Sequence, residues 1–253
     1  MKATPEHAAN RPSAVARLRR WHRWLGVTIG IQFLAWTIGG LYFSWSDIDE
    51  VHGDDLRNKG PAPAVTFSGA SLDSIVGAVT RADGGHVSHI ALMPLADGNA
   101  VYHLVGVDAD GKPREHLADA RTGALRAPLS EAEAGDLARA TYAGTGAITS
   151  RDLLESVGSH HEYRGRPLPA WAFTFDDSRR TRIYVAASEA RVTTVRNSRW
   201  RIFDFLWMVH TMDYAGRDDL NNWLLRAFAV FGLATLASGF ALFFATQRRS
   251  ARR

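Results

Sequence analysis

The chain has 253 residues, a formal net charge of +4, 46% apolar residues and no cysteine. The lack of cysteine excludes disulfides, iron–sulfur clusters, thiolate metal sites and covalently attached c-type haem, so a metal or haem would need His, Met, Tyr or carboxylate ligands. The arginines gather beside two apolar segments, which indicates membrane orientation and argues against nucleic-acid binding.

The first predicted element is a transmembrane helix over residues 24–45, which follows a basic segment over residues 1–23. The span holds no charged residue, and at 1.5 Å per residue it would be about 33 Å long, enough to cross a bilayer. A signal peptide is the alternative, but the apolar stretch is longer than the apolar part of such peptides, and no small-x-small cleavage motif follows it. We therefore expect an uncleaved anchor.

Residues 46–198 have the pattern of an α+β domain that contains two copies of one unit, at about 70–127 and about 129–197. Each copy begins with a helix and continues with strands separated by turns. The helix of the second copy starts at the capping-box pair Ser130 and Glu133. A shift of 69 residues aligns Trp171 with Tyr102 and superimposes the two copies, which predicts an internal duplication.

Residues 199–221 are predicted to form a helix and a loop at the membrane surface, because apolar side chains gather on one helical face there. A second transmembrane helix over residues 222–245 and a basic tail over residues 246–253 follow. The positive-inside rule predicts that both termini are cytoplasmic and that the central domain lies across the membrane, in the periplasm of a bacterial cell.

Three segments resemble the PepSY-associated transmembrane family: RRWHRWLGVTIGIQFLAWTIGGLYF, DARTGAL and LWMVHTMDYAGRDDLNNWLLRAFAVFGLATLASGFALFF. The likeness covers nearly the whole chain. It implies an inner-membrane protein with two transmembrane α-helices and a periplasmic α+β domain of two PepSY-like repeats, each a helix with an antiparallel sheet. Larger members have four spans, and some are reductases that bind b-type haem and deliver electrons to ferric siderophores. Soluble PepSY domains are associated with inhibition or regulation of peptidases.

His22 is a candidate haem ligand at the cytoplasmic end of the first span, because Gly26 and Gly30 continue its helical face and would let a flat macrocycle approach the backbone. The alternative is that His22 joins an interfacial belt with the neighbouring tryptophans, while the glycines receive another helix. Gln32 could contact a quinone or a haem propionate, or make an interhelical hydrogen bond.

His210 is the second candidate haem ligand, because it lies on an apolar, aromatic helical face. The alternative is a hydrogen-bonded histidine where the central domain meets the membrane. About 30 Å of bilayer would separate His210 from His22, so one haem cannot bridge them. A homodimer would pair each histidine with its own copy, and His52 is the rival partner for His210.

Other histidines carry weaker signals. The VHGDDLR segment around His52 and the His160–His161 pair could each bind a divalent metal, although neither has a diagnostic ligand spacing. The remaining histidines of the predicted sheets are expected on the surface: His86, His89, His103 and His116.

The resemblance implies two alternative functions. One is haem b-dependent electron transfer from a quinol or a redox protein to a periplasmic acceptor such as a ferric siderophore. The other is a non-enzymatic role, in which the anchored domain binds or regulates a peptidase or another partner.

Overall fold

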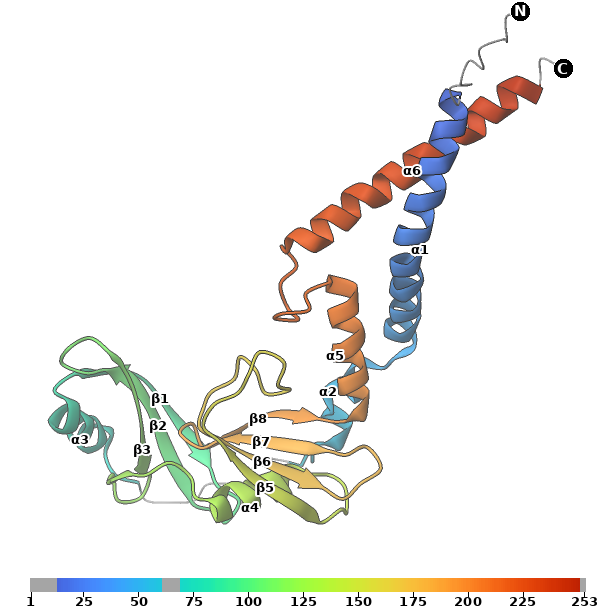
Figure 1. The fold of residues 1–253 in the computed structure, drawn as a ribbon. Helices are drawn as coiled ribbons and strands as arrows, with labels where there is room; N and C mark the ends of the chain where they lie inside the picture. The colour runs from blue at the N-terminus through green and yellow to red at the C-terminus, as the bar shows by residue number, and fades with distance from the viewer. Residues whose placement is uncertain (1–12, 61–68, 251–253) are drawn as a thin grey trace, which may run out of the picture. The chain divides into compact units, whose positions relative to one another are not determined.

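The structure, a computed structural model, describes residues 13–60 and 69–250 (Figure 1). The chain divides into a helical unit, formed by the residues up to Trp45 and those from Phe205 onward, and an α+β unit over Ser46–Asp204. The first part of the predicted basic N-terminus and the last three residues of the predicted tail lie outside the described residues.

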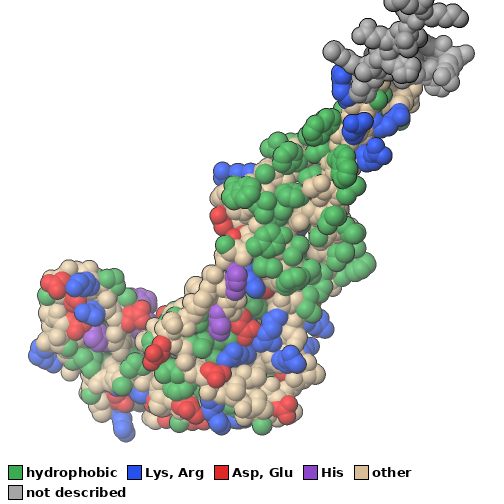
Figure 2. Space-filling view, in the orientation of Figure 1, with side chains coloured by type: hydrophobic (Ala, Val, Ile, Leu, Met, Phe, Trp, Pro, Cys, Tyr) green, Lys and Arg blue, Asp and Glu red, His purple; other side chains and the backbone are tan. Residues whose placement is uncertain are grey.

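Two long helices, α1 (Ala14–Trp45) and α6 (Trp223–Ser250), pack against each other in the helical unit. Both are long and apolar enough to cross a membrane. Most of their large apolar side chains are exposed, as Figure 2 shows in green, which suits helices whose solvent is lipid. Helix α1 begins ten residues before the predicted span, because residues 14–23 contain no proline or glycine to delay it.

A shorter helix, α5 (Ser198–Thr211), begins in the α+β unit and ends in the helical unit. It corresponds to the helix predicted within residues 199–221. A loop over residues 212–222 joins it to α6. Asn222 caps α6, because its side-chain oxygen accepts a hydrogen bond from the Leu225 N–H at 2.9 Å.

The α+β unit begins with the short helices α2 (Ile48–His52) and η1 (Asp54–Leu56). The first repeat follows as α3 (Leu72–Asp83), β1 (His86–Pro94), β2 (Ala100–Val107), β3 (Pro113–Asp119) and β4 (Leu125–Arg126). Its strands form an antiparallel sheet in the order β1-β2-β3-β4. Ile75 and Val79 of α3 pack against Leu104 and Ala118 of this sheet and form its local core.

The second repeat has the same order of elements: α4 (Glu131–Thr141), β5 (Ile148–Leu154), β6 (Ala170–Phe175), β7 (Arg182–Ala186) and β8 (Arg191–Arg196). Its sheet is antiparallel in the order β5-β6-β7-β8, and the first strand of each sheet carries an irregularity near its start. The capping box of Ser130 and Glu133 is present. The α+β class of the central domain and its two units, each a helix with an antiparallel sheet, are therefore confirmed.

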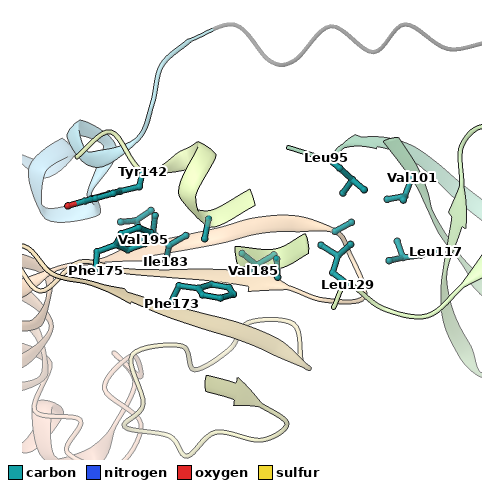
Figure 3. Packing of buried hydrophobic residues seen from close by; sticks show 13 residues of the cluster. Leu95, Val101, Leu117, Leu129, Tyr142, Phe173, Phe175, Ile183, Val185 and Val195 are labelled. Atoms are coloured by element: carbon teal, nitrogen blue, oxygen red, sulfur yellow. The ribbon is translucent and has the colours of Figure 1, made fainter. Parts of the chain in front are cut away.

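One hydrophobic core joins the two repeats. Leu95, Val101 and Leu117 of the first repeat belong to the same buried cluster as Leu129 and Val185 of the second (Figure 3). Helix α4 covers one face of the second sheet and contributes Ala134 and Ala138 to this cluster, and Tyr142, which follows the helix, also belongs to it.

The two repeats differ most in the connection between their first two strands. Residues 95–99 join β1 to β2, whereas residues 155–169 join β5 to β6. We call this longer connection the 155–169 loop. Its Tyr163 is fully buried and stacks on Tyr184, with ring centroids 4.6 Å apart.

Ion pairs tie the 155–169 loop to the first turns of α5. Glu162 accepts hydrogen bonds from the Tyr184 hydroxyl at 2.6 Å and from Arg201 Nε at 2.7 Å. Arg164 Nη2 donates to Asp204 Oδ1 at 2.7 Å. The loop is therefore held by side chains of both the sheet and the helix.

Candidate functional site

His22 is the best-defined candidate ligand of the helical unit. Its Nδ1 lies 2.8 Å from the Ser238 hydroxyl oxygen on α6, and that hydroxyl donates to the Thr235 carbonyl oxygen, also at 2.8 Å. A serine hydroxyl has one hydrogen, so Ser238 accepts from the Nδ1–H of His22. The second ring nitrogen, Nε2, then carries the lone pair that a metal ligand needs.

An open groove lies beside His22 on the surface of α6. It has a volume of about 470 Å³, within the range of about 300–1,000 Å³ that is common for small-molecule sites. Its lining is almost wholly apolar, and it consists of His22, Thr235, Leu236, Gly239, Phe240, Phe243 and Phe244. A Cβ atom at Gly239 would lie 3.3 Å from His22 Cε1, so the bare backbone there gives the imidazole its space.

Gly26 and Gly30, the predicted approach surface for a macrocycle, do not line this groove. A Cβ atom at either position would meet nothing within 4 Å among the described residues, so α6 does not pack on them either. The glycines at the α1–α6 contact are instead Gly232 and Gly239 of α6, and a Cβ at Gly232 would lie 3.6 Å from Phe33 Cζ. The helices meet along the line of α1 that carries His22, Ile29 and Phe33, and Ile29 is buried there.

His210 lies in an aromatic environment near the end of α5. Its ring stacks on Trp207, with centroids 6.2 Å apart and an interplanar angle of 13°. The rings of Trp36 and Phe43 lie 5.7 Å and 6.1 Å away. Next to it, Gln32 Nε2 donates to the Val209 carbonyl oxygen at 2.9 Å, which is the interhelical hydrogen bond expected as one of its two roles.

The two histidines lie far apart along α1. His210 packs against Trp36 and Phe43, which follow His22 by 14 and 21 residues. At 1.5 Å per helical residue these separations are about 21 Å and about 32 Å. One cofactor therefore cannot contact both imidazoles within one chain.

The side chains around His52 and the His160–His161 pair are engaged with protein groups. His52 is exposed at the end of α2, and the nearby Asp55 pairs with Arg179. His161 Nδ1 accepts the Tyr163 N–H at 3.1 Å. No group of three His, Asp or Glu side chains suited to a metal ion occurs in the described part of the chain. The pairing of His52 with His210 stays a prediction.

His103 departs from the expectation that the sheet histidines are exposed. It is only 9% exposed, opposite Leu117 of β3, and its Nε2 lies 3.5 Å from a Glu115 carboxylate oxygen. The alternation along β2 turns this residue toward the side away from α3, where part of the shared core lies.

The model of the PepSY-associated TM region matches residues 4–246. The chain belongs to the PepSY-associated transmembrane family. Together with α1 and α6, this membership makes it a membrane protein that contacts the lipid bilayer. No curated protein and no solved structure matches the chain.

The His22 groove of this PepSY-associated protein fits a haem in three respects. It offers an imidazole whose Nε2 has no hydrogen-bond partner among the described residues, an apolar and aromatic lining, and a bare helix surface at Gly239. No second histidine lines the groove within the described chain. A six-coordinate iron would therefore need a ligand from another molecule.

The sequence did not predict several residues at the groove of the PepSY-associated protein. These residues are Ser238, Gly239 and the three phenylalanines. The sequence feature that could have indicated them is their spacing. Thr235, Gly239 and Phe243 are four residues apart and so lie on one face of the helix. Only the contact with His22, 216 residues away, distinguishes this face from the rest of an apolar helix.

Proposed function

We propose that this PepSY-associated protein is an inner-membrane haem protein that transfers electrons across the bilayer to a periplasmic acceptor such as a ferric siderophore. The observation that carries the proposal is the hydrogen bond from His22 to Ser238, which leaves Nε2 available beside an apolar groove. A metal-binding histidine is commonly held in this way, with its other ring nitrogen donating to a fixed acceptor.

His22 would hold a haem b iron through Nε2, and the phenylalanines of α6 would form the apolar shell that excludes water and tunes the potential. Bound haem supplies one-electron redox chemistry, which no amino-acid side chain of this cysteine-free chain offers so readily. Gly239 keeps the groove open beside the imidazole, because any larger residue would crowd His22.

A second copy of the chain would complete the site. The groove is open and has one imidazole, so a two-fold axis that brings the partner's His22 to the same iron would provide the second ligand. Gly26 and Gly30 present open backbone on α1 that a partner helix could approach closely. Two chains would together supply four spans.

His210 would hold a second haem, about 20–30 Å along α1 from the first. Stacking on Trp207 restrains the ring, and Trp36 and Phe43 provide apolar surroundings. The exposed arginines at the start of α1, Arg17, Arg19, Arg20 and Arg23, support a cytoplasmic location for the His22 end. The electrons would come from a quinol or a redox protein.

The test is haem content. The full chain is expressed with ample haem, purified in neutral detergent, and examined for a Soret band, for haem per chain and for mass in solution. We expect a dimer with one haem per chain, half that content in His22→Ala or His210→Ala, and none in the double variant. His86→Ala, which removes an exposed histidine from the α+β unit, is the matched control.

Two results would count against the proposal in different ways. A haem-replete preparation without a Soret band would refute haem binding and would favour the partner-binding role of the anchored domain. Full haem content in both single variants would show that other residues hold the iron.

A further inference from the structure

The outer strands of the two sheets differ in how they are protected from pairing with another chain. An outer strand leaves backbone N–H and C=O groups unpaired along one side, and proteins protect such an edge by short length, by burial or by charge. Strand β4 has only two residues, and most of β8 is buried. Strand β5 carries Arg151 and Asp152, which form ion pairs with Glu131 and Arg182.

Strand β1 has none of these protections in the described part of the chain. It is nine residues long, its sequence HVSHIALMP contains no Asp, Glu, Lys or Arg, and β2 is its strand neighbour on one side (Figure 1). None of its residues is buried, and Leu92 is 41% exposed. Unpaired backbone groups along an uncharged, accessible edge are best satisfied by another extended backbone.

The regular part of β1 is symmetrical about Ala91. A register shift between Val87 and His89 interrupts the pairing near the start of the strand, and Pro94 at its end has no N–H to donate. The segment that can add a further regular strand is therefore residues 89–93, with Ala91 at its centre.

We propose that β1 is an interface between two copies of this chain, in which the two β1 strands pair antiparallel about a two-fold axis at Ala91. Such an axis, perpendicular to the sheet, keeps each side chain on its own face. Ala91 then lies opposite the partner's Ala91, and Leu92 lies opposite the partner's Ile90. Ile90 packs on the α3 side of the sheet, and Leu92 follows it by two residues on the same face.

A second copy fits this edge because the pairing complements itself. Each exposed Leu92 gains an apolar neighbour, and no charged side chain of either strand enters the interface. The same pairing gives a reason for the difference between the repeats. A charge on β1 such as Arg151 carries on β5 would lie within the interface, close to its own copy.

This interface goes beyond the proposed haem site and shares with it only the second copy. Strand β1 lies wholly in the α+β unit, and its pairing needs no haem. It would join the first sheets of the two copies into one continuous sheet. Haem binding and β1 pairing can therefore be tested separately.

Cysteine cross-linking of the full chain in neutral detergent tests the pairing, because the natural chain has no cysteine. Opposed residues of antiparallel strands have Cα atoms about 4.5–5.5 Å apart, which suits a disulfide. Under mild oxidation, Ala91→Cys should therefore run as a dimer on a non-reducing gel. Ser88→Cys is the control on the same strand, since Ser88 is exposed and its two copies would lie about 20 Å apart.

A change of charge provides a second measurement. In the Ala91→Cys chain, Leu92→Lys should lower the cross-linked fraction severalfold, because it places a charge opposite the partner's Ile90. Leu153→Lys is the matched control, since Leu153 is an exposed leucine of β5, 45% exposed, and its replacement should leave cross-linking unchanged. Circular dichroism checks that both variants fold.

The outcomes separate this interface from the haem proposal. Cross-linking of Ala91→Cys in a sample without a Soret band would support the β1 interface while refuting the haem site. A Soret band without cross-linking above the Ser88→Cys level would overturn the β1 interface. An equal effect of Leu92→Lys and Leu153→Lys would also overturn it.

Discussion

Glu162 should contribute measurably to the stability of the α+β unit. Its side chain is only 14% exposed, and its carboxylate accepts three hydrogen bonds, from the Tyr184 hydroxyl at 2.6 Å and from Arg201 at 2.7 Å and 3.1 Å. Breaking a buried ion pair costs about 3–5 kcal/mol. Because the Arg201 side chain is 35% exposed, water can solvate its guanidinium when the carboxylate is removed. We therefore expect Glu162→Gln to lower the free energy of unfolding by about 2 kcal/mol.

A loss of this size is visible in thermal unfolding. For a unit as large as Ser46–Asp204, each kcal/mol shifts Tm by about 2–4 °C, so Glu162→Gln should lower Tm by about 4–8 °C at neutral pH. Circular dichroism of the full chain in neutral detergent measures this transition. Glu155→Gln is the matched control, because Glu155 is an exposed residue of the same loop.

The same variant should also differ from the wild type in its pH dependence. Burial alone would raise the pKa of Glu162, but the hydrogen bonds of Arg201 and Tyr184 outweigh it and the pKa lies below its ordinary value of 4.5. The folded state therefore gains stability above that value and loses it as pH falls through the lowered pKa. The Tm difference should shrink in acid. Equal Tm values at neutral pH, or an equal loss in Glu155→Gln, would refute the reasoning.

Two further predictions concern Ser238 and Tyr142. Ser238→Ala should leave the fold intact but weaken haem retention about 10–100-fold, because His22 loses the acceptor that orients its ring. Transfer of haem to apomyoglobin measures this retention. Thr246→Ala is the control and should retain haem, because the Thr246 hydroxyl bonds only carbonyls of its own helix. Burial, reinforced by Asp177, raises the pKa of Tyr142 to about 12. The stabilisation that the protonated Tyr142 provides is therefore lost as pH rises from about 10 toward 12. Between about pH 9 and pH 11, the free energy of unfolding measured in urea should fall by about 1 kcal/mol more in the wild type than in Tyr142→Phe. The same change in unfolding free energy with pH in the wild type and in Tyr142→Phe would contradict this prediction.

Local patterns predicted the elements of this fold well. The apolar spans and the capping box at Ser130 depend on neighbouring residues, and the structure has them where expected. The internal repeat was also predictable from local patterns, because each copy follows the same order of helix, strands and turns. Strand β5 and the 155–169 loop were not located, since this polar stretch has neither strand nor helix periodicity.

The candidate sites depend on contacts that sequence spacing does not reveal. Ser238 orients His22 from the other end of the chain. Glycines illustrate the difference. The sequence singled out Gly26 and Gly30 because they share a helical face with His22, whereas the crossing of the two helices brings Gly239 to the imidazole. Periodicity identifies faces, but the packing of helices selects which face is used.

The core that joins the two repeats bears on how such a domain can change over time. Leu95, Val101 and Leu117 are covered by side chains of the other copy, so a first repeat on its own would leave them in water. Either repeat on its own would expose apolar surface, and replacing one repeat would alter the surface that it shares with the other. The two repeats therefore act as one structural unit, and a chimaera of related proteins should exchange both repeats together.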